Sequence, residues 1–162
     1  MKKLLFACAM LCAVFLFGCK KDKAQNPQDS LFIGANKNSA AWVAKVTTEY
    51  TTNKDSLNIW GFVDQPEETL SIRFKFIGVG QTNIGAKNTY YNTTLGRDAI
   101  TSDYILDTTK ANTVNITSFN VATGLAQGDF TATFKKVYGG SSAPESIVFS
   151  SGKFWVAVPP VK

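Results

Sequence analysis

Strict alternation of apolar and polar residues is the sequence feature that most constrains what this chain can fold into. In one short segment every second position is apolar, and these positions are Leu70, Ile72, Phe74 and Phe76. The residues between them are serine, arginine and lysine. A period of two places successive side chains on opposite faces of a β-strand and does not fit the period of a helix. The segment is therefore predicted to be a strand with one buried face.

The same alternation recurs through the chain after residue 30. Further examples are Trp42, Ala44 and Val46, then Phe130, Ala132 and Phe134, and finally Phe154, Val156 and Val158. Turn-forming residues separate these short runs, and no amphipathic segment of helix length lies between them. Short, regularly spaced strands predict an all-β fold, either an antiparallel β-sandwich or a flattened barrel of about eight strands.

Two predictions concern individual turns. Residues 112–119 and 125–134 are predicted to form a hairpin with a five-residue loop, in which Gly124 supplies the positive φ that the turn needs. Ser151 and Gly152 are predicted to separate two strands, because a glycine beside a serine is typical of a turn.

The N-terminal residues have the pattern of an export and anchoring segment. Two lysines precede an apolar run of 14 residues, 4–17, which is short for a helix that must cross a hydrocarbon core of about 30 Å. Residues 1–18 are therefore predicted to be a signal peptide that is removed. The junction Leu16-Phe17-Gly18-Cys19 resembles the lipobox of bacterial lipoproteins, which implies that Cys19 carries acyl chains such as palmitate.

In this interpretation residues 19–30 are the lipidated cysteine and a flexible tether, because they are mostly polar and charged. Residues 31–162 then form a single β-domain. Several acyl chains would hold the protein at a membrane, since one chain alone binds only marginally. The alternative is an ordinary secretory signal in which Cys19 has no role.

The chain contains no histidine, and its three cysteines are Cys8, Cys12 and Cys19. Histidine-based triads, cysteine nucleophiles, zinc sites of thiolates or imidazoles, and disulfides within the β-domain are therefore excluded. No metal and no cofactor is expected. The net charge of +5 falls close to zero in residues 31–162, which hold 12 basic and 10 acidic residues. Because the basic residues are scattered, no nucleic-acid partner is expected.

Four segments of the predicted β-domain carry a resemblance to a known family. They are Ala40–Ala44, Val114–Phe119, Gly128–Phe134 and Ile147–Phe154. With the anchored N-terminus and a composition rich in threonine and asparagine, they resemble an uncharacterised family of small Bacteroidota lipoproteins with a single β-rich domain. The resemblance spans about residues 31–158. It implies an exported protein, lipid-anchored at the outer membrane on its periplasmic or surface face, and it implies no catalytic residues.

Aromatic side chains are the candidate ligand-binding residues. Five of them lie among asparagine, threonine and serine: Trp60, Tyr90, Tyr91, Tyr104 and Trp155. Flat rings beside amide and hydroxyl groups can bind a glycan or an envelope protein, because the ring supplies apolar area and the polar groups fix orientation. The alternative is that these rings fill the core on the second face of a sheet.

Carboxylates are the remaining candidates for acid–base chemistry. Asp64, Glu67 and Glu68 fall in one predicted turn, and three further aspartates surround the predicted strand 100–106: Asp98, Asp103 and Asp107. We interpret all six as solvated turn acids.

The leading hypothesis is therefore a lipid-anchored, non-catalytic module of the cell envelope that binds a ligand or supports an assembly. The alternatives are a carboxylate-dependent glycan hydrolase and a lipocalin-like carrier of an apolar ligand. Two carboxyl groups within about 10 Å of each other in a cleft would favour the hydrolase. A large apolar cavity inside a barrel would favour the carrier.

The lipobox interpretation predicts the effect of Cys19→Ala. The variant should move from the detergent phase to the aqueous phase in a phase-partition assay, or accumulate as an unprocessed precursor, because the acyl chains have no attachment point. Unchanged partition into the detergent phase would contradict lipidation at this position.

Overall fold

The structure is a computed structural model that describes residues 31–51 and 55–159. The predicted signal peptide, Cys19 and the tether lie outside the described residues. No helix among the described residues is long and apolar enough to cross a membrane. The predicted all-β fold is confirmed, with nine strands: β1 (Phe32–Lys37), β2 (Ala40–Thr51), β3 (Ser56–Asp64), β4 (Glu67–Lys75), β5 (Gly80–Leu95), β6 (Ala99–Leu106), β7 (Thr113–Asn120), β8 (Leu125–Gly139) and β9 (Ser146–Ala157).

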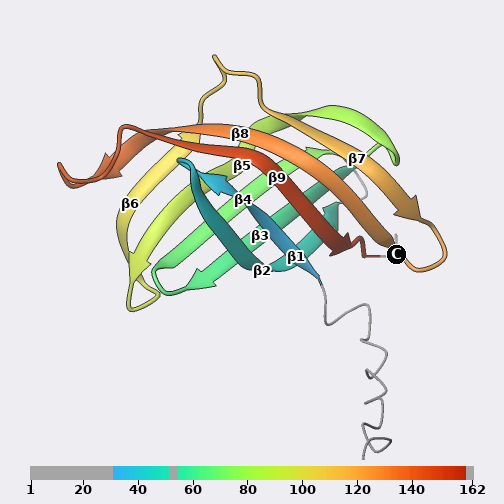
Figure 1. The fold of residues 1–162 in the computed structure, drawn as a ribbon, viewed down its shortest axis with the longest axis horizontal. Helices are drawn as coiled ribbons and strands as arrows, with labels where there is room; N and C mark the ends of the chain where they lie inside the picture. Colours follow the sequence, from blue (N-terminus) through green and yellow to red (C-terminus); the bar gives the residue numbers. More distant parts are fainter. Residues whose placement is uncertain (1–30, 52–54, 160–162) are drawn as a thin grey trace, which may run out of the picture.

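The strands close into an antiparallel barrel with eight strand positions (Figure 1). Seven positions are single strands, in the order β4-β3-β2-β1-β9-β8 and then β5, which pairs back to β4. The eighth position, between β8 and β5, is shared by β6 and β7. β6 pairs with residues 90–95 of β5 and β7 with residues 80–83, so the two short strands follow one another along the same gap. Closure gives each described strand a partner on both sides and leaves no free sheet edge.

The connection between β6 and β7, residues 107–112, bulges from the barrel wall. The side chain of Asn112 forms the hydrogen bonds that the backbone cannot form there. Its buried side-chain oxygen accepts a hydrogen bond from the backbone N–H of Thr133 at 2.7 Å. Its side-chain nitrogen donates to the carbonyl oxygens of Asp107 at 2.8 Å and Lys110 at 3.0 Å. The amide therefore stands in for a backbone group that the bulge removes from the ladder beside β8.

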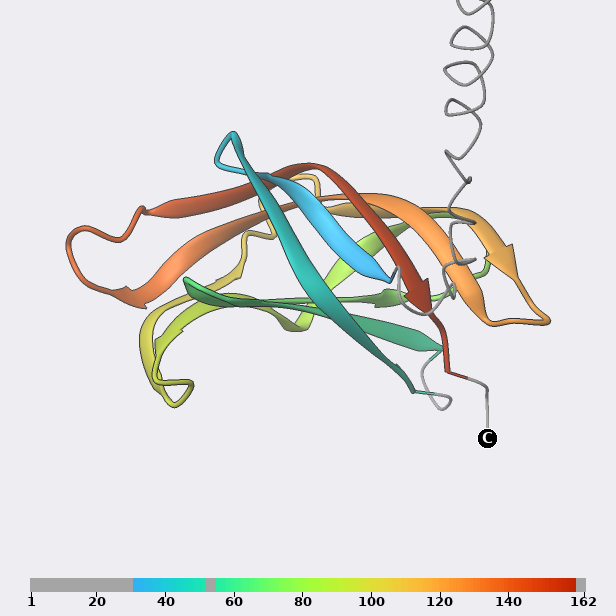
Figure 2. The ribbon, with the colours of Figure 1, turned by 60° about the horizontal axis from the view of Figure 1, so that its bottom comes forward.

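Aromatic side chains fill the inside of the barrel. In Figure 2 the wall formed by β1, β8 and β9 lies over the wall formed by β3, β4 and β5, so the barrel is flattened. Phe149 is fully buried between the walls, and its ring centroid lies 5.1–6.5 Å from those of Trp42, Tyr91, Phe130 and Phe134. These distances are in the range of favourable aromatic pairs.

Glycines on neighbouring strands make room for large rings. A Cβ placed on Gly61 would lie 2.8 Å from the Trp42 ring. One on Gly128 would meet the Phe154 ring, and one on Gly152 would meet the ring of Phe130. Placing a glycine beside each large ring in this way lets the interior of a small barrel pack densely.

The two turn predictions had different outcomes. β7 ends at Asn120 and β8 begins at Leu125, which confirms the hairpin with a loop of four residues where five were predicted, and Gly124 has a φ of 70°. The prediction for Ser151 and Gly152 is wrong, because β9 continues through both residues and only shifts its register against β1 and β8 there. The glycine serves packing: the Phe130 ring occupies the space where its Cβ would be, and Ser151 takes the left-handed φ of 51° in the bulge.

The two ends of the barrel differ in what they carry. At one end, here called the terminal end, β1 begins and β9 ends, so the first and the last described residues lie there. The opposite end, the distal end, carries the β1–β2, β3–β4, β5–β6 and β8–β9 connections. In Figure 1 the terminal end is on the right, beside the C-terminal label, and the distal end is on the left.

The close approach at Gly128 predicts that Gly128→Ala destabilises the barrel. The new methyl group would overlap the Phe154 ring and the carbonyl oxygen of Asn115, and the backbone atom cannot move aside. Overpacking of this kind costs about 2 kcal/mol, which thermal denaturation detects as a lower midpoint. Gly140→Ala is the matched control, because nothing lies within 4 Å of its Cβ position. Equal midpoints for the two variants would contradict the packing account.

Candidate functional site

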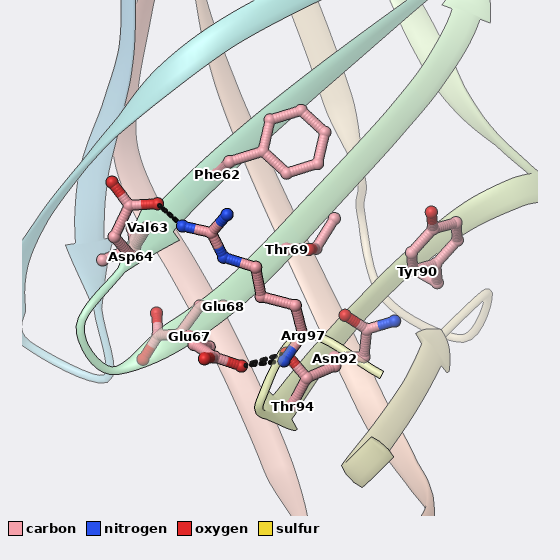
Figure 3. Close-up of a pocket in the computed structure, with 10 residues that line it drawn as sticks. All are labelled: Phe62, Val63, Asp64, Glu67, Glu68, Thr69, Tyr90, Asn92, Thr94 and Arg97. Atoms are coloured by element: carbon pink, nitrogen blue, oxygen red, sulfur yellow. Dashed lines mark hydrogen bonds and ion pairs between the residues drawn. The ribbon is translucent and has the colours of Figure 1, made fainter. Parts of the chain in front are cut away.

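Two pockets lie at the distal end and share one wall. The outer pocket is a hollow of about 470 Å³ on the outside of the barrel (Figure 3). The inner pocket, about 390 Å³, is the mouth of the barrel itself. The wall between them belongs to β4 and β5, whose residues face alternately outward and inward. Residues that line the outer pocket are Phe62, Val63, Asp64, Glu67, Glu68, Thr69, Tyr90, Asn92, Thr94 and Arg97.

Cross-strand pairing places the side chains of the outer pocket. Phe62 on β3 is paired with Thr69 on β4, and Thr69 is paired with Asn92 on β5. Tyr90 follows on the same face of β5, so the Phe62 and Tyr90 rings stand on either side of the Thr69 hydroxyl in Figure 3. Phe62 is 40% exposed although it is a large apolar residue. The pocket thus combines two ring surfaces with a hydroxyl and an amide.

A bulge in β5 sets the position of Tyr90. Residues 86–89 have no partner on β4, and pairing resumes where Tyr90 lies opposite Ser71. The bulge is held by the Thr89 hydroxyl, which accepts a hydrogen bond from the backbone N–H of Arg73 at 3.0 Å. On the other side, the Ser71 hydroxyl donates to the carbonyl oxygen of Asn88 at 2.8 Å. The outward direction of Tyr90 therefore depends on buried hydrogen bonds.

Arg97 brings positive charge to the outer pocket. Its side chain extends along one side of the pocket toward Asp64, where a guanidinium nitrogen lies 3.7 Å from the carboxylate (Figure 3). Both side chains are mostly exposed, so this ion pair is weak and the guanidinium can turn toward a ligand. The backbone N–H of Arg97 donates to Glu67 at 2.8 Å. This bond, with that from the Thr94 hydroxyl, fixes the loop at the pocket edge.

The two carboxylates at this edge are held ionised. The Lys45 ammonium donates a hydrogen bond to Asp64 at 2.6 Å and keeps the pKa of that carboxyl below its usual value. Hydrogen bonds from the Arg97 N–H and from Thr94 lower the pKa of Glu67 in the same way. A general acid needs a raised pKa, so neither group is set up to donate a proton near neutral pH.

Asn92 has hydrogen-bonding capacity that the described protein does not use. Its side-chain oxygen is buried and has no hydrogen-bond partner. Among the described residues, one other buried side-chain atom shares this state, Nε1 of Trp155. Buried polar atoms in folded proteins are almost always paired, so an unpaired one marks a place where a ligand or water completes the network.

The inner pocket has a buried ion pair at its base. The carboxylate of Glu68 is 4% exposed and forms an ion pair with Lys37. The same carboxylate accepts a hydrogen bond from Trp42 Nε1 at 2.6 Å, and the Lys37 ammonium donates to the Tyr91 hydroxyl at 3.1 Å. Burial, reinforced by the Glu68 charge, raises the pKa of Tyr91, so its hydroxyl stays protonated. Every charged group of this cluster has a partner.

The five predicted aromatic residues do not form one site. Trp60 and Tyr90 lie on the outer face, in one cross-strand row with Ser71 between them. Tyr91 and Tyr104 face the barrel interior, are 2% and 1% exposed, and line the inner pocket. Trp155 is half-buried on the outer face of β9, beside a separate hollow of about 390 Å³. Of the five, Tyr90 lines the outer pocket.

Glu68 corrects the interpretation of the acids. Asp64 lies in an exposed hairpin end, as expected of a solvated turn acid, but Glu68 is buried inside the barrel. The signal was present in the sequence, because Glu68 is in phase with the inward-facing Leu70 and Ile72.

Sequence reasoning also missed Phe62, Thr69, Asn92 and Arg97. Phe62 alone had a signal, since it is an aromatic residue on the outward phase of β3. In the described part of the chain, no cluster of three or more acidic, histidine or cysteine residues could hold a metal ion.

The Glu68 cluster predicts that Glu68→Gln lowers stability by about 3 kcal/mol, because removing one partner leaves a charge inside the barrel without its counter-charge. The double change Lys37→Met with Glu68→Leu should recover part of this loss, since no unpaired charge remains. Thermal denaturation measures both. As a control, Lys45→Met breaks the exposed pair with Asp64 and should leave the midpoint nearly unchanged. Equal midpoints for Glu68→Gln and Lys45→Met would contradict a structural role for the buried pair.

Comparison with known proteins leaves the site to be interpreted from its own geometry. No protein-family profile matches the chain, and neither a curated protein nor a solved structure is significantly similar to it. The roles of the pocket residues therefore rest on the contacts described above.

Proposed function

We propose that this chain is a lipid-anchored lipoprotein of the outer membrane whose barrel is a non-catalytic module that binds a glycan in the outer pocket. The observation that carries the proposal is the set of groups lining that pocket. Two aromatic rings, Phe62 and Tyr90, stand on either side of the Thr69 hydroxyl, and the Asn92 amide and the Arg97 guanidinium line the same pocket. The export and anchoring part of the proposal rests on the N-terminal sequence and its lipobox junction.

These groups match the two surfaces of a sugar. A pyranose ring has an apolar face of C–H groups, which packs on aromatic rings, and a rim of hydroxyls, which exchange hydrogen bonds with amides, hydroxyls and guanidinium groups. The side-chain amide of Asn92, whose buried oxygen has no partner in the described protein, lies among these groups. Arg97 can donate hydrogen bonds to a sugar hydroxyl, because its weak pair with Asp64 can be exchanged.

The alternatives receive less support. Asp64 and Glu67 are cross-strand neighbours that line the outer pocket, so two carboxyl groups do lie close together there. A glycan hydrolase also needs one carboxyl group with a raised pKa, but Asp64 and Glu67 have lowered pKa values and Glu68 is engaged with Lys37. A carrier of apolar ligands needs room inside the barrel. Aromatic rings around Phe149 fill the middle of the described interior, and an apolar hollow of about 500 Å³ is present only at the mouth of the terminal end. Because this hollow does not extend into the middle of the barrel, the lipocalin-like hypothesis receives less support.

The proposal predicts that Tyr90→Ala and Asn92→Ala each weaken glycan binding about tenfold or more, which corresponds to roughly 1.4 kcal/mol lost at one well-placed contact. A glycan array with neutral and acidic sugars, probed with the full chain in detergent, identifies the ligand. Titration calorimetry then measures the variants.

Tyr138→Ala is the matched control. Tyr138 is an exposed tyrosine on β8, 61% accessible, and it does not line the outer pocket. Its replacement should leave affinity unchanged, and unchanged melting midpoints should show that all three variants stay folded. An array without any bound glycan, or an equal loss for Tyr138→Ala, would overturn glycan binding at this pocket.

A further inference from the structure

The terminal end carries an apolar surface that the proposed function does not use. Its mouth is a hollow of about 500 Å³, and three of its aromatic residues are stacked edge to face, Phe76 lying 6.1 Å from Tyr50 and 5.0 Å from Phe119 between ring centroids. The β4–β5 loop, residues 76–79, and the β7–β8 loop, residues 121–124, lie at this end of the barrel. The apolar rim, defined here as Ile77, Val79 and Val121, is 53%, 63% and 83% exposed.

The β4–β5 loop is connected to the β7–β8 loop through the last residues of β7. β5 and β7 are paired, with Gly80 opposite Ile116, and the Phe76 ring next to the first loop contacts the Phe119 ring next to the second. The C-terminal part of the described chain is fastened to the second loop, because the backbone N–H of Val158 donates to the carbonyl oxygen of Gly124 at 2.7 Å. The apolar rim, the mouth and the last described residues thus form one continuous surface.

Charge is distributed in the opposite way. Residues 76–79 and 121–124 contain no charged side chain, whereas the distal connections carry Arg97, Asp98 and Glu145. Beside the terminal mouth, the described charges next to the 76–79 loop are Lys75 and Asp55, which have opposite sign. An exposed apolar surface without charge marks an interaction site, and the lack of charged residues favours an apolar partner.

The polypeptide that leads to the lipid anchor leaves the barrel at this same end. β1 begins at Phe32, which is paired with Trp155 close to the mouth. The 12 residues from Cys19 to Ser30 reach at most about 40 Å even when fully extended. An anchor at Cys19 therefore keeps the terminal end near the bilayer at high effective concentration, where even a weak apolar contact is populated.

We propose that the apolar rim docks on the bilayer that holds the lipid anchor, with Val121, Val79 and Ile77 inserted among the headgroups and the stacked rings of the mouth at the interface. Aromatic residues favour this depth of a membrane, and modest apolar surfaces bind there when a second signal adds to them. The inference rests on the lipid anchoring proposed above. Docking in this way points the outer pocket away from the membrane.

Fluorescent labelling of the lipidated full chain tests the docking. The sequence has no cysteine after Cys19, whose sulfur the lipid occupies, so an introduced cysteine is the single free thiol. Val121→Cys and Val79→Cys place an environment-sensitive dye on the apolar rim. Ser141→Cys places the same dye on an exposed residue of the distal end and serves as the matched control. All three positions are exposed, so equal melting midpoints are expected.

The labelled proteins are reconstituted in vesicles of phosphatidylethanolamine and phosphatidylglycerol, with and without lipids that carry a quencher just below the headgroup. The expected result is a blue-shifted emission and several-fold stronger lipid quenching at Val121 and Val79 than at Ser141. Equal quenching at all three positions would overturn the docking. So would shielding of Val121 from aqueous iodide without lipid quenching, which would indicate a second protein copy on this surface.

Flotation separates the failure of this inference from that of the anchoring. A chain that floats with the vesicles but shows no difference between the dye positions is anchored and not docked. A chain that does not float has no lipid anchor, and both proposals then fail.

Discussion

The packing of aromatic rings around Phe149 is the interaction on which the rest of this structure depends. Rings from both walls of the flattened barrel meet its ring, and glycines at Gly61, Gly128 and Gly152 provide the space they occupy. Because these rings fill the interior, any ligand site must lie at the ends of the barrel or on its outer face. The position of the candidate site therefore follows from how the core is packed.

In the closed barrel, polar side chains supply hydrogen bonds and counter-charges that the strands alone do not provide. The eighth strand position is divided between β6 and β7, and the Asn112 amide restores the hydrogen bonds lost at the division. At the distal mouth, the side chains of Lys37 and Glu68 face the barrel interior and form an ion pair there. Both features stabilise the closed ring, and the Lys37–Glu68 pair also adds charge to the distal end.

The two ends of the barrel consequently present different chemistry. The distal end offers rings, amides and charged groups, whereas the terminal end offers aliphatic loops and stacked aromatic rings. This polarity coincides with the direction of the chain, because the segment that leads to the predicted lipid anchor joins the barrel at the apolar end. Under the proposed anchoring, the outer pocket faces the solvent and the apolar rim faces the membrane.

The alternation in the sequence determined the all-β fold and the inward phase of Leu70, Ile72 and Phe74 in β4, and the turn residues around Gly124 determined the hairpin. They did so because the side-chain period of a strand and the residue preferences of a turn are local properties. Only the tertiary structure decided that β5 closes onto β4, that Ser151 and Gly152 form a bulge, and that Tyr90 and Tyr91 serve opposite faces of one wall. The outer pocket likewise depends on the register that brings Phe62, Thr69 and Asn92 together, and pairing between residues so far apart in the chain leaves no mark in any one segment.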